Sequence, residues 1–163
     1  MKRFVVWAKV GLALVILVGC ATTPPVQPNT PLRDTEVFAS PFPKVWSALI
    51  ATLAEQAYPI EVIEKESGVV TTRFVTFTGG KTDAQIDAVA VKPNYPLATW
   101  ESGKYTLSIF VAKTNSLTTT VKVTSHIEAL VKPFMVDVPN WVGCDSKGVM
   151  EKRLFDVIKE KLK

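Results

Sequence analysis

The sequence predicts a single α+β domain in which two helices pack on one face of an antiparallel sheet, behind a secretory leader and a proline-rich tether. Two observations predict the domain. Apolar residues recur at helical spacing near both of its ends, and apolar and polar residues alternate along two long segments between them. Such alternation marks strands with one buried face. We expect the leader over residues 1–19, a lipid-bearing cysteine and linker over 20–35, and the domain over 36–163.

The composition supports one folded domain and excludes several classes of function. The chain has 163 residues, of which 47% are hydrophobic and 21% charged, which is enough for a core but too short for a large multidomain enzyme. Two cysteines and one histidine cannot supply the four ligands of a structural zinc site. Because no catalytic constellation is apparent, we expect a protein without enzymatic activity, a metal or a dissociable cofactor.

The first twenty residues have the form of a secretory signal peptide. Lys2 and Arg3 precede an apolar stretch whose uninterrupted part, residues 10–20, is shorter than the roughly 20 helical residues that span a bilayer. The Leu-Val-Gly-Cys sequence ending at Cys20 resembles the lipobox of bacterial lipoproteins. That resemblance implies cleavage between Gly19 and Cys20, a diacylglycerol on the Cys20 sulfur and an acyl chain on its new amine. The alternative is a plain secretory leader.

A lipid on Cys20 would anchor the chain without spanning the membrane. More than one acyl chain makes attachment stable, because each buried methylene contributes about 0.8 kcal/mol. Asp after the lipidated cysteine is the usual inner-membrane retention signal in Gram-negative lipoproteins, and this chain has Ala21 there. The resemblance therefore implies the outer membrane, with the domain facing the periplasm.

Removal of the leader changes the charge of the chain. The precursor has a pI near 9.1 and a mean hydropathy of +0.20. Three of its 19 basic residues lie in the leader, so that 16 remain against 15 acidic residues. The remaining lysines are scattered along the chain, which argues against a nucleic-acid partner.

Residues 21–33 are expected to be an extended spacer. The segment reads ATTPPVQPNTPLR, with four prolines among polar residues and no apolar periodicity. At about 3.1 Å per residue it would hold a domain on the order of 40 Å from the lipid surface. A binding role for the prolines is the alternative.

The first half of the domain is predicted to contain a helix and a hairpin. Ser40 and Pro41 resemble a helix start, with a hydroxyl as cap, and apolar residues then recur at helical spacing until Tyr58-Pro59. They are Val45, Trp46, Leu49, Ile50, Leu53 and Ala57. Residues 60–65 and 69–77 are rich in β-formers and are joined by a tight turn at Glu66-Ser67-Gly68.

The second half is predicted to contain two long strands and a terminal helix. A short helix is expected over residues 83–91 and a loop over 92–99. Strands follow at 105–111 and 120–129, with a turn at 113–116. Residues 132–144 are expected to be irregular. Apolar residues then line one side of a last helix, with basic residues opposite them. The apolar residues are Met150, Leu154, Val157, Ile158 and Leu162.

The leader, the tether and the first helix and hairpin together resemble one known family. The run Ser-Pro-Phe-Pro-Lys-Val-Trp-Ser-Ala-Leu from Ser40 and the run Ser-Gly-Val-Val-Thr-Thr from Ser67 resemble the helix-grip domains of BamC-like lipoproteins. BamC is the accessory lipoprotein of the outer-membrane barrel-assembly machinery and carries two such domains, whereas this chain has room for one. The resemblance implies a helix-grip-like fold and a non-enzymatic interaction or assembly-accessory protein.

The residue types that carry chemistry are sparse. The alternation places His126 on the polar face of a strand, where a surface histidine is expected, because catalysis would require an orienting carboxylate and a nucleophile. With Cys20 acylated, Cys144 is the remaining thiol, and we expect it to be buried and inert, with an intermolecular or redox role as the alternative.

Two further patterns have simple structural explanations. Gly79-Gly80-Lys81-Thr82 lacks the first glycine of a phosphate-binding loop, since Val75 occupies that position, and we expect a turn. Asp83 and Asp87 lie four residues apart, which is more typical of a solvated helix face than of metal ligands.

Aromatic residues in or beside the irregular segments are the candidates for a partner surface. They are Trp100, Phe134 and Trp141, with Met135 beside them. Exposed aromatics can anchor interfaces, and the alternative is that they close one end of the core. We therefore expect a lipid-anchored envelope protein that binds another envelope protein. The alternative function is a periplasmic carrier of a lipid or other hydrophobic ligand.

Overall fold

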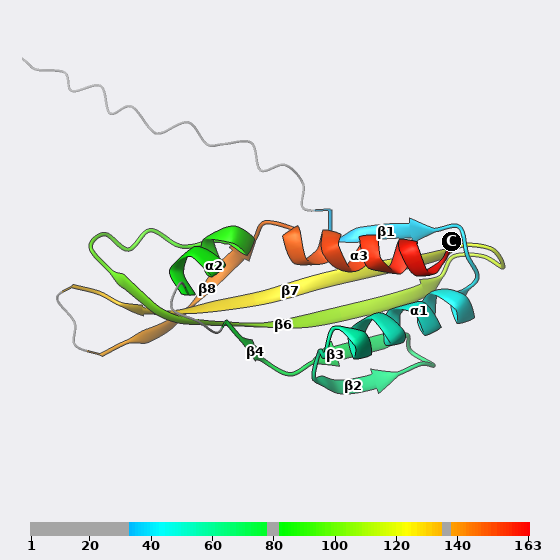
Figure 1. Ribbon diagram of the computed structural model, residues 1–163, viewed down its shortest axis with the longest axis horizontal. Helices are drawn as coiled ribbons and strands as arrows, with labels where there is room; N and C mark the ends of the chain where they lie inside the picture. The colour runs from blue at the N-terminus through cyan, green and yellow to red at the C-terminus, as the bar shows by residue number, and fades with distance from the viewer. Residues whose placement is uncertain (1–32, 78–81, 135–137) are drawn as a thin grey trace, which may run out of the picture.

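A computed structural model describes residues 33–77, 82–134 and 138–163 (Figure 1). The elements follow one another as β1 (Thr35–Phe38), α1 (Phe42–Glu55), β2 (Ile60–Glu64), β3 (Val69–Thr72), β4 (Val75–Thr76), α2 (Thr82–Val89), β5 (Ala90–Val91), β6 (Thr99–Lys113), β7 (Thr119–Lys132), β8 (Asn140–Ser146) and α3 (Val149–Lys161). The fold class is α+β, as the sequence predicts.

The long hairpin of β6 and β7 forms the centre of an open antiparallel sheet. The strand order is β2-β3-β6-β7-β8-β5. On the outer side of β6, β3 pairs with one end and β4 with a more central part. On the outer side of β7, β1 pairs with the amino-terminal end and β8 with the carboxyl-terminal end. β2 and β1 therefore lie on opposite sides of the central hairpin, as Figure 1 shows.

The two faces of the β6–β7 hairpin differ as the alternation predicts. Side chains of one face are buried, and we call it the covered face; its residues include Leu107, Ile109, Val111, Val121 and Val123. The alternate residues make up the open face. Helices α1 and α3 pack on the covered face through one buried cluster, to which α1 contributes Val45, Leu49 and Leu53. Helix α2 packs on the same face through Ile86, which joins Ile127 and Ala129 in a second cluster.

Helix α1 confirms the predicted apolar stripe but differs at both ends. Pro41 occupies the N-cap position, and no side chain caps the helix. The predicted hydroxyl cap from Ser40 is therefore wrong; the Ser40 carbonyl instead accepts a hydrogen bond from the Thr119 hydroxyl at 2.9 Å. The helix ends at Glu55, and Ala57 has a φ of 56°, outside helical geometry. A proline in the first turn has no backbone N–H, so it leaves one group fewer for a cap to satisfy.

The predicted tight turn before β3 requires glycine. Gly68 has a φ of +73°, and a Cβ at this position would lie 2.0 Å from the Val111 carbonyl oxygen. Val111 also donates its backbone N–H to the Gly68 carbonyl at 2.8 Å. The turn therefore attaches the β2–β3 hairpin to the long strand β6.

Several expected boundaries are corrected by the structure. Residues 132–144, expected to be irregular, contain the end of β7 and most of β8. The expected strand over 69–77 is divided into β3 and β4, with Arg73 and Phe74 between them. β1 begins at Thr35. The short helix expected over 83–91 is present as α2, but it ends at Val89, and residues 90–91 form β5. Three described helices, instead of two, therefore lie on the sheet.

Some predictions fall on residues outside the described ranges. They concern the leader with Gly19 and Cys20, the tether up to residue 32, the Gly79-Gly80-Lys81 turn and Met135. Over the rest of the chain, no helix has the length and apolar character that crossing a bilayer would take.

Candidate binding surface on the open face of the sheet

Short hydroxyl side chains make up part of the open face of the β6–β7 hairpin. They are Thr106, Ser108, Thr120 and Thr124. All of them are exposed or half-buried, in contrast to the alternate residues of the same strands. The three described helices pack on the other face, so this surface is available to a binding partner.

A charged aromatic cluster stands at one end of this face, with Lys104 of β6 at its centre. The Lys104 Nζ lies 2.8 Å from Glu128 Oε2 of β7. The same nitrogen lies 4.3 Å from the ring centroid of Phe74 and 4.2 Å from that of Trp141. An ammonium group over an aromatic face is attracted by the negative centre of the ring. We call these four residues the Lys104 cluster.

The two rings of the Lys104 cluster are exposed although they are large and apolar. Phe74 is 55% and Trp141 40% exposed. They come from segments far apart in sequence, the break between β3 and β4 and the start of β8. Their meeting over Lys104 follows from the register, because Lys104 lies opposite Thr76 of β4 and Glu128 of β7, and Trp141 lies opposite Leu130.

A depression of about 760 Å³ adjoins this cluster. Its lining includes Phe74, Thr106, His126, Gly143 and Asp145. A Cβ on Gly143 would meet no atom within 4 Å, so the surface over this residue is open. The depression combines an aromatic ring, an imidazole and a carboxylate, which suits the side chains of a protein partner.

The structure separates the three aromatic residues predicted to form a partner surface. Trp141 lies on the open face. Trp100 lies opposite Val131 on the covered face, where its ring meets Tyr95 edge-on at 6.2 Å. Phe134 is 75% exposed just beyond β7. Sequence reasoning missed Phe74 and Lys104, because only the pairing of β4 and β8 with the central hairpin brings them to Trp141.

His126 and Cys144 lie on opposite faces. His126 is exposed on the open face, opposite Thr106, as the alternation predicts. Cys144 is half-buried on the covered face opposite Ile127, and burial raises the pKa of its thiol. The thiol is thus less buried than predicted, and its inert role stays a prediction. Within the described ranges, no three His, Cys, Asp or Glu side chains gather as metal ligands would.

Asp83 and Asp87 hold one lysine. Lys92 Nζ forms ion pairs with both carboxylates, at 3.0 Å from Asp87 Oδ1. Burial opposes the charge on Lys92, but the hydrogen bonds to the two carboxylates outweigh it and raise the pKa of the lysine. The same ammonium lies 5.0 Å from the ring centroid of Trp100. The pair expected on a solvated face thus joins α2 to the loop before β6.

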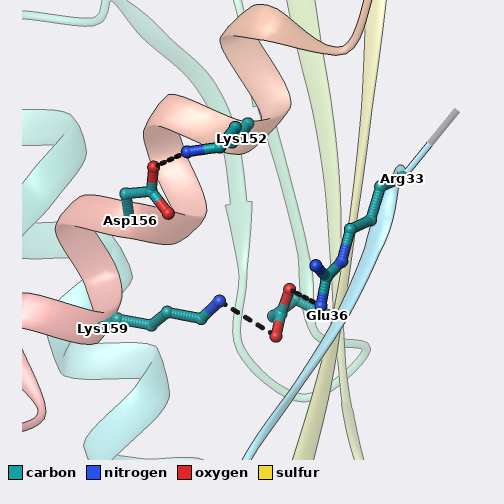
Figure 2. A network of polar contacts seen from close by, with 5 residues as sticks. All are labelled: Arg33, Glu36, Lys152, Asp156 and Lys159. Carbon is teal, nitrogen blue, oxygen red and sulfur yellow. Dashed lines mark hydrogen bonds and ion pairs between the residues drawn. The ribbon is translucent and has the colours of Figure 1, made fainter.

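The described chain begins at Arg33, just before β1, and an ion pair attaches β1 to α3 (Figure 2). The Glu36 carboxylate lies 3.0 Å from Arg33 Nη2 and 3.0 Å from Lys159 Nζ of α3. The Glu36 side chain is only 11% exposed, so the pair with Lys159 is partly shielded from water. On α3 itself, Lys152 and Asp156 form a separate exposed pair at 2.5 Å.

Compared with known proteins, the chain matches no family model and no curated sequence.

Proposed function

We propose that this chain is a lipid-anchored envelope protein whose folded domain binds another envelope protein and catalyses no reaction. The anchor is the acylated Cys20, the membrane is the outer membrane and the domain faces the periplasm. The open face of the sheet is the binding surface. The resemblance to BamC-like lipoproteins supports an assembly-accessory role and a helix-grip-like arrangement.

The exposed aromatic rings of the Lys104 cluster are the observation that carries this proposal. Trp and Phe rings left in water lose the free energy that burial would provide, about 25 cal/mol per Å² of apolar surface. Aromatic side chains are enriched at protein interfaces, where they act as anchors. Phe74 and Trp141 are held in place by Lys104, so little conformational entropy is lost when a partner covers them.

The packing of α1 favours this function over that of a hydrophobic carrier. A carrier would need apolar surface facing a cavity beneath the helix. The buried residues Val45, Leu49 and Leu53 of α1 pack in one cluster with the covered face and with Leu154 and Ile158 of α3. The apolar side of α1 is thus already engaged within the domain.

The anchor is tested by metabolic labelling of the host with a palmitate analogue that carries a click-reactive group. The wild-type chain should incorporate the label and fractionate with outer membranes. The Cys20→Ser variant should not be labelled, and Cys144→Ser serves as the matched control that keeps the label. Label on the Cys20→Ser variant would contradict a lipid at Cys20. So would the absence of label from both the wild-type chain and the Cys144→Ser variant.

The binding surface is tested by photocrosslinking in living cells. A photoreactive amino acid replaces Thr106 at the centre of the open face or, as the control, exposed Glu160 on α3. We expect a discrete crosslinked product from position 106 alone, which weakens when Phe74 and Trp141 are both changed to Ala. Equal products from the two positions would argue against the open face as the interface.

A further inference from the structure

The outer edge of β2 is a second surface without a partner. β2 ends the strand order on its side of the sheet, and among the described residues no strand or helix pairs with its outer edge. Residues Glu61 to Glu64 are all exposed. Val62 is 44% and Ile63 53% exposed, on opposite faces of the strand. An edge strand of this kind presents backbone N–H and C=O groups to any extended chain.

The charges beside this edge are mostly acidic. Glu61, Glu64 and Glu66 lie within six residues, with Lys65 as the one basic residue among them. Neither Glu61 nor Glu64 forms an ion pair within the described part of the chain, although the Ser67 hydroxyl donates to Glu64 Oε2 at 2.8 Å. The edge therefore carries free negative charge on both sides of two exposed aliphatic residues.

A second copy of the same chain satisfies this edge less well. In a two-fold antiparallel pair centred on Val62 or Ile63, residues of the same parity face one another, so Glu61 would face Ile63 or Lys65 and Glu64 would face Ile60 or Val62. In both registers Glu64 is left opposite an aliphatic residue. A strand with basic residues opposite both glutamates would instead gain two favourable cross-strand pairs and bury the two aliphatic residues.

The position of β2 also suits a partner rather than the bilayer. The described chain begins at Arg33, just before β1, and β1 lies on the other side of the central hairpin (Figure 1). Four strand spacings of about 4.8 Å, roughly 19 Å in all, separate β1 from β2. The β2 edge thus lies on the side of the sheet away from the tether.

We propose that β2 accepts an extended segment of a partner protein as an added strand, with basic residues facing Glu61 and Glu64 and apolar residues facing Val62 and Ile63. This inference rests on the proposed function, in which the domain binds another envelope protein, and it adds how part of that partner would bind. It concerns a different surface from the open face, and the two can be tested separately.

The test uses the full-length chain in a nonionic detergent and a capped hexapeptide, Thr-Lys-Val-Val-Lys-Thr, as the probe. Backbone amide NMR shifts report where the peptide binds. We expect the largest shifts at Val62 and Ile63 and slower hydrogen exchange along β2. The same peptide with glutamate in place of both lysines should bind at least tenfold more weakly, and so should a peptide N-methylated at alternate residues, because it lacks backbone donors.

Charge reversal on the protein provides the matched control. The Glu61→Lys/Glu64→Lys variant should lose at least tenfold in affinity for the lysine peptide and gain affinity for the glutamate peptide. Reversal of two exposed glutamates elsewhere, Glu101→Lys/Glu160→Lys, should leave both affinities within twofold. This titration needs neither the anchor nor the cell, so its failure is distinct from failure of the labelling or crosslinking experiments.

Three results would overturn the proposal. The first is peptide-induced shifts confined to the depression around Gly143. The second is unchanged binding after reversal of Glu61 and Glu64. The third is no binding of the lysine peptide at millimolar concentration while the NMR spectrum shows a folded domain.

Discussion

The covered and open faces of the β6–β7 hairpin belong to the same two strands but differ in how deeply their side chains are buried. On the covered face, Leu107, Ile109 and Val123 are almost completely buried beneath the helices. On the open face, neighbouring residues such as Thr106 and Ser108 are polar and partly exposed, and the large apolar groups that do occur are left in water. One face stabilises the fold, and the other is left uncovered by the described helices.

The largest expected effect comes from the covered face. Leu107→Ala removes most of a fully buried side chain and should lower the free energy of unfolding by about 3 kcal/mol, because the transfer free energy of the removed atoms is lost and a cavity is left behind. Thr106→Ala, its neighbour on the open face, should change it by less than about 0.5 kcal/mol. Urea denaturation of both variants measures the difference. Similar losses in the two variants would mean that side chains of the two faces contribute equally to the free energy of unfolding.

Two glycines provide a matched pair for the next largest effect. A Cβ on Gly103, on the covered face, would lie 2.7 Å from Phe77 and 2.8 Å from Ile86, whereas one on Gly143 would meet nothing within 4 Å. Gly103→Ala should therefore destabilise the protein by about 2 kcal/mol through overpacking beneath α2. Gly143→Ala should be neutral within about 0.5 kcal/mol. A costly Gly143→Ala would show that the open face is covered after all.

The open face should contribute a smaller, local coupling. A double-mutant cycle with Lys104→Met and Trp141→Leu should give an interaction free energy of about 0.5–1 kcal/mol, as expected of an ammonium group on an aromatic ring near the protein surface. Denaturation midpoints of the four proteins measure it. A coupling of zero would mean that Lys104 does not hold Trp141 in place, which would remove one argument for a preformed binding surface.

The last prediction concerns the reactivity of the half-buried thiol. Because burial raises the pKa of Cys144, it should react with a disulfide reagent at pH 7 roughly tenfold more slowly than an exposed cysteine introduced by Ser116→Cys. After denaturation, the mature wild-type chain should expose one reactive thiol if Cys20 is a thioether. Two reactive thiols would contradict acylation, and fast reaction in the native state would contradict burial.

The long strands and the two main helices could be predicted because their own residues specify them. The alternation along β7 and the stripe along α1 are local patterns, and the structure confirms both. β8 was missed because Asn140, Gly143 and Asp145 are poor β-formers and none of its side chains is fully buried. Its pairing with β7 depends on register over long range, which a local pattern does not contain.

The candidate site was predictable only in part for the same reason. Trp141 could be named from its residue type, but Trp100 has the same type and lies on the covered face, beyond a register shift in β6 between Trp100 and Ser102. Phe74 and Lys104 had no distinguishing local pattern. Only the meeting of four separate segments on one face identifies the cluster.

The attachment of β1 has a mechanical consequence. A pull on the chain ahead of Arg33, directed along the strand, would load the four residue pairs between β1 and β7 together in shear instead of peeling them apart one at a time. The ion pair between Glu36 and Lys159 adds a second point of resistance, from α3. The domain should therefore resist a pull along β1 better than a pull that lifts β1 away from β7.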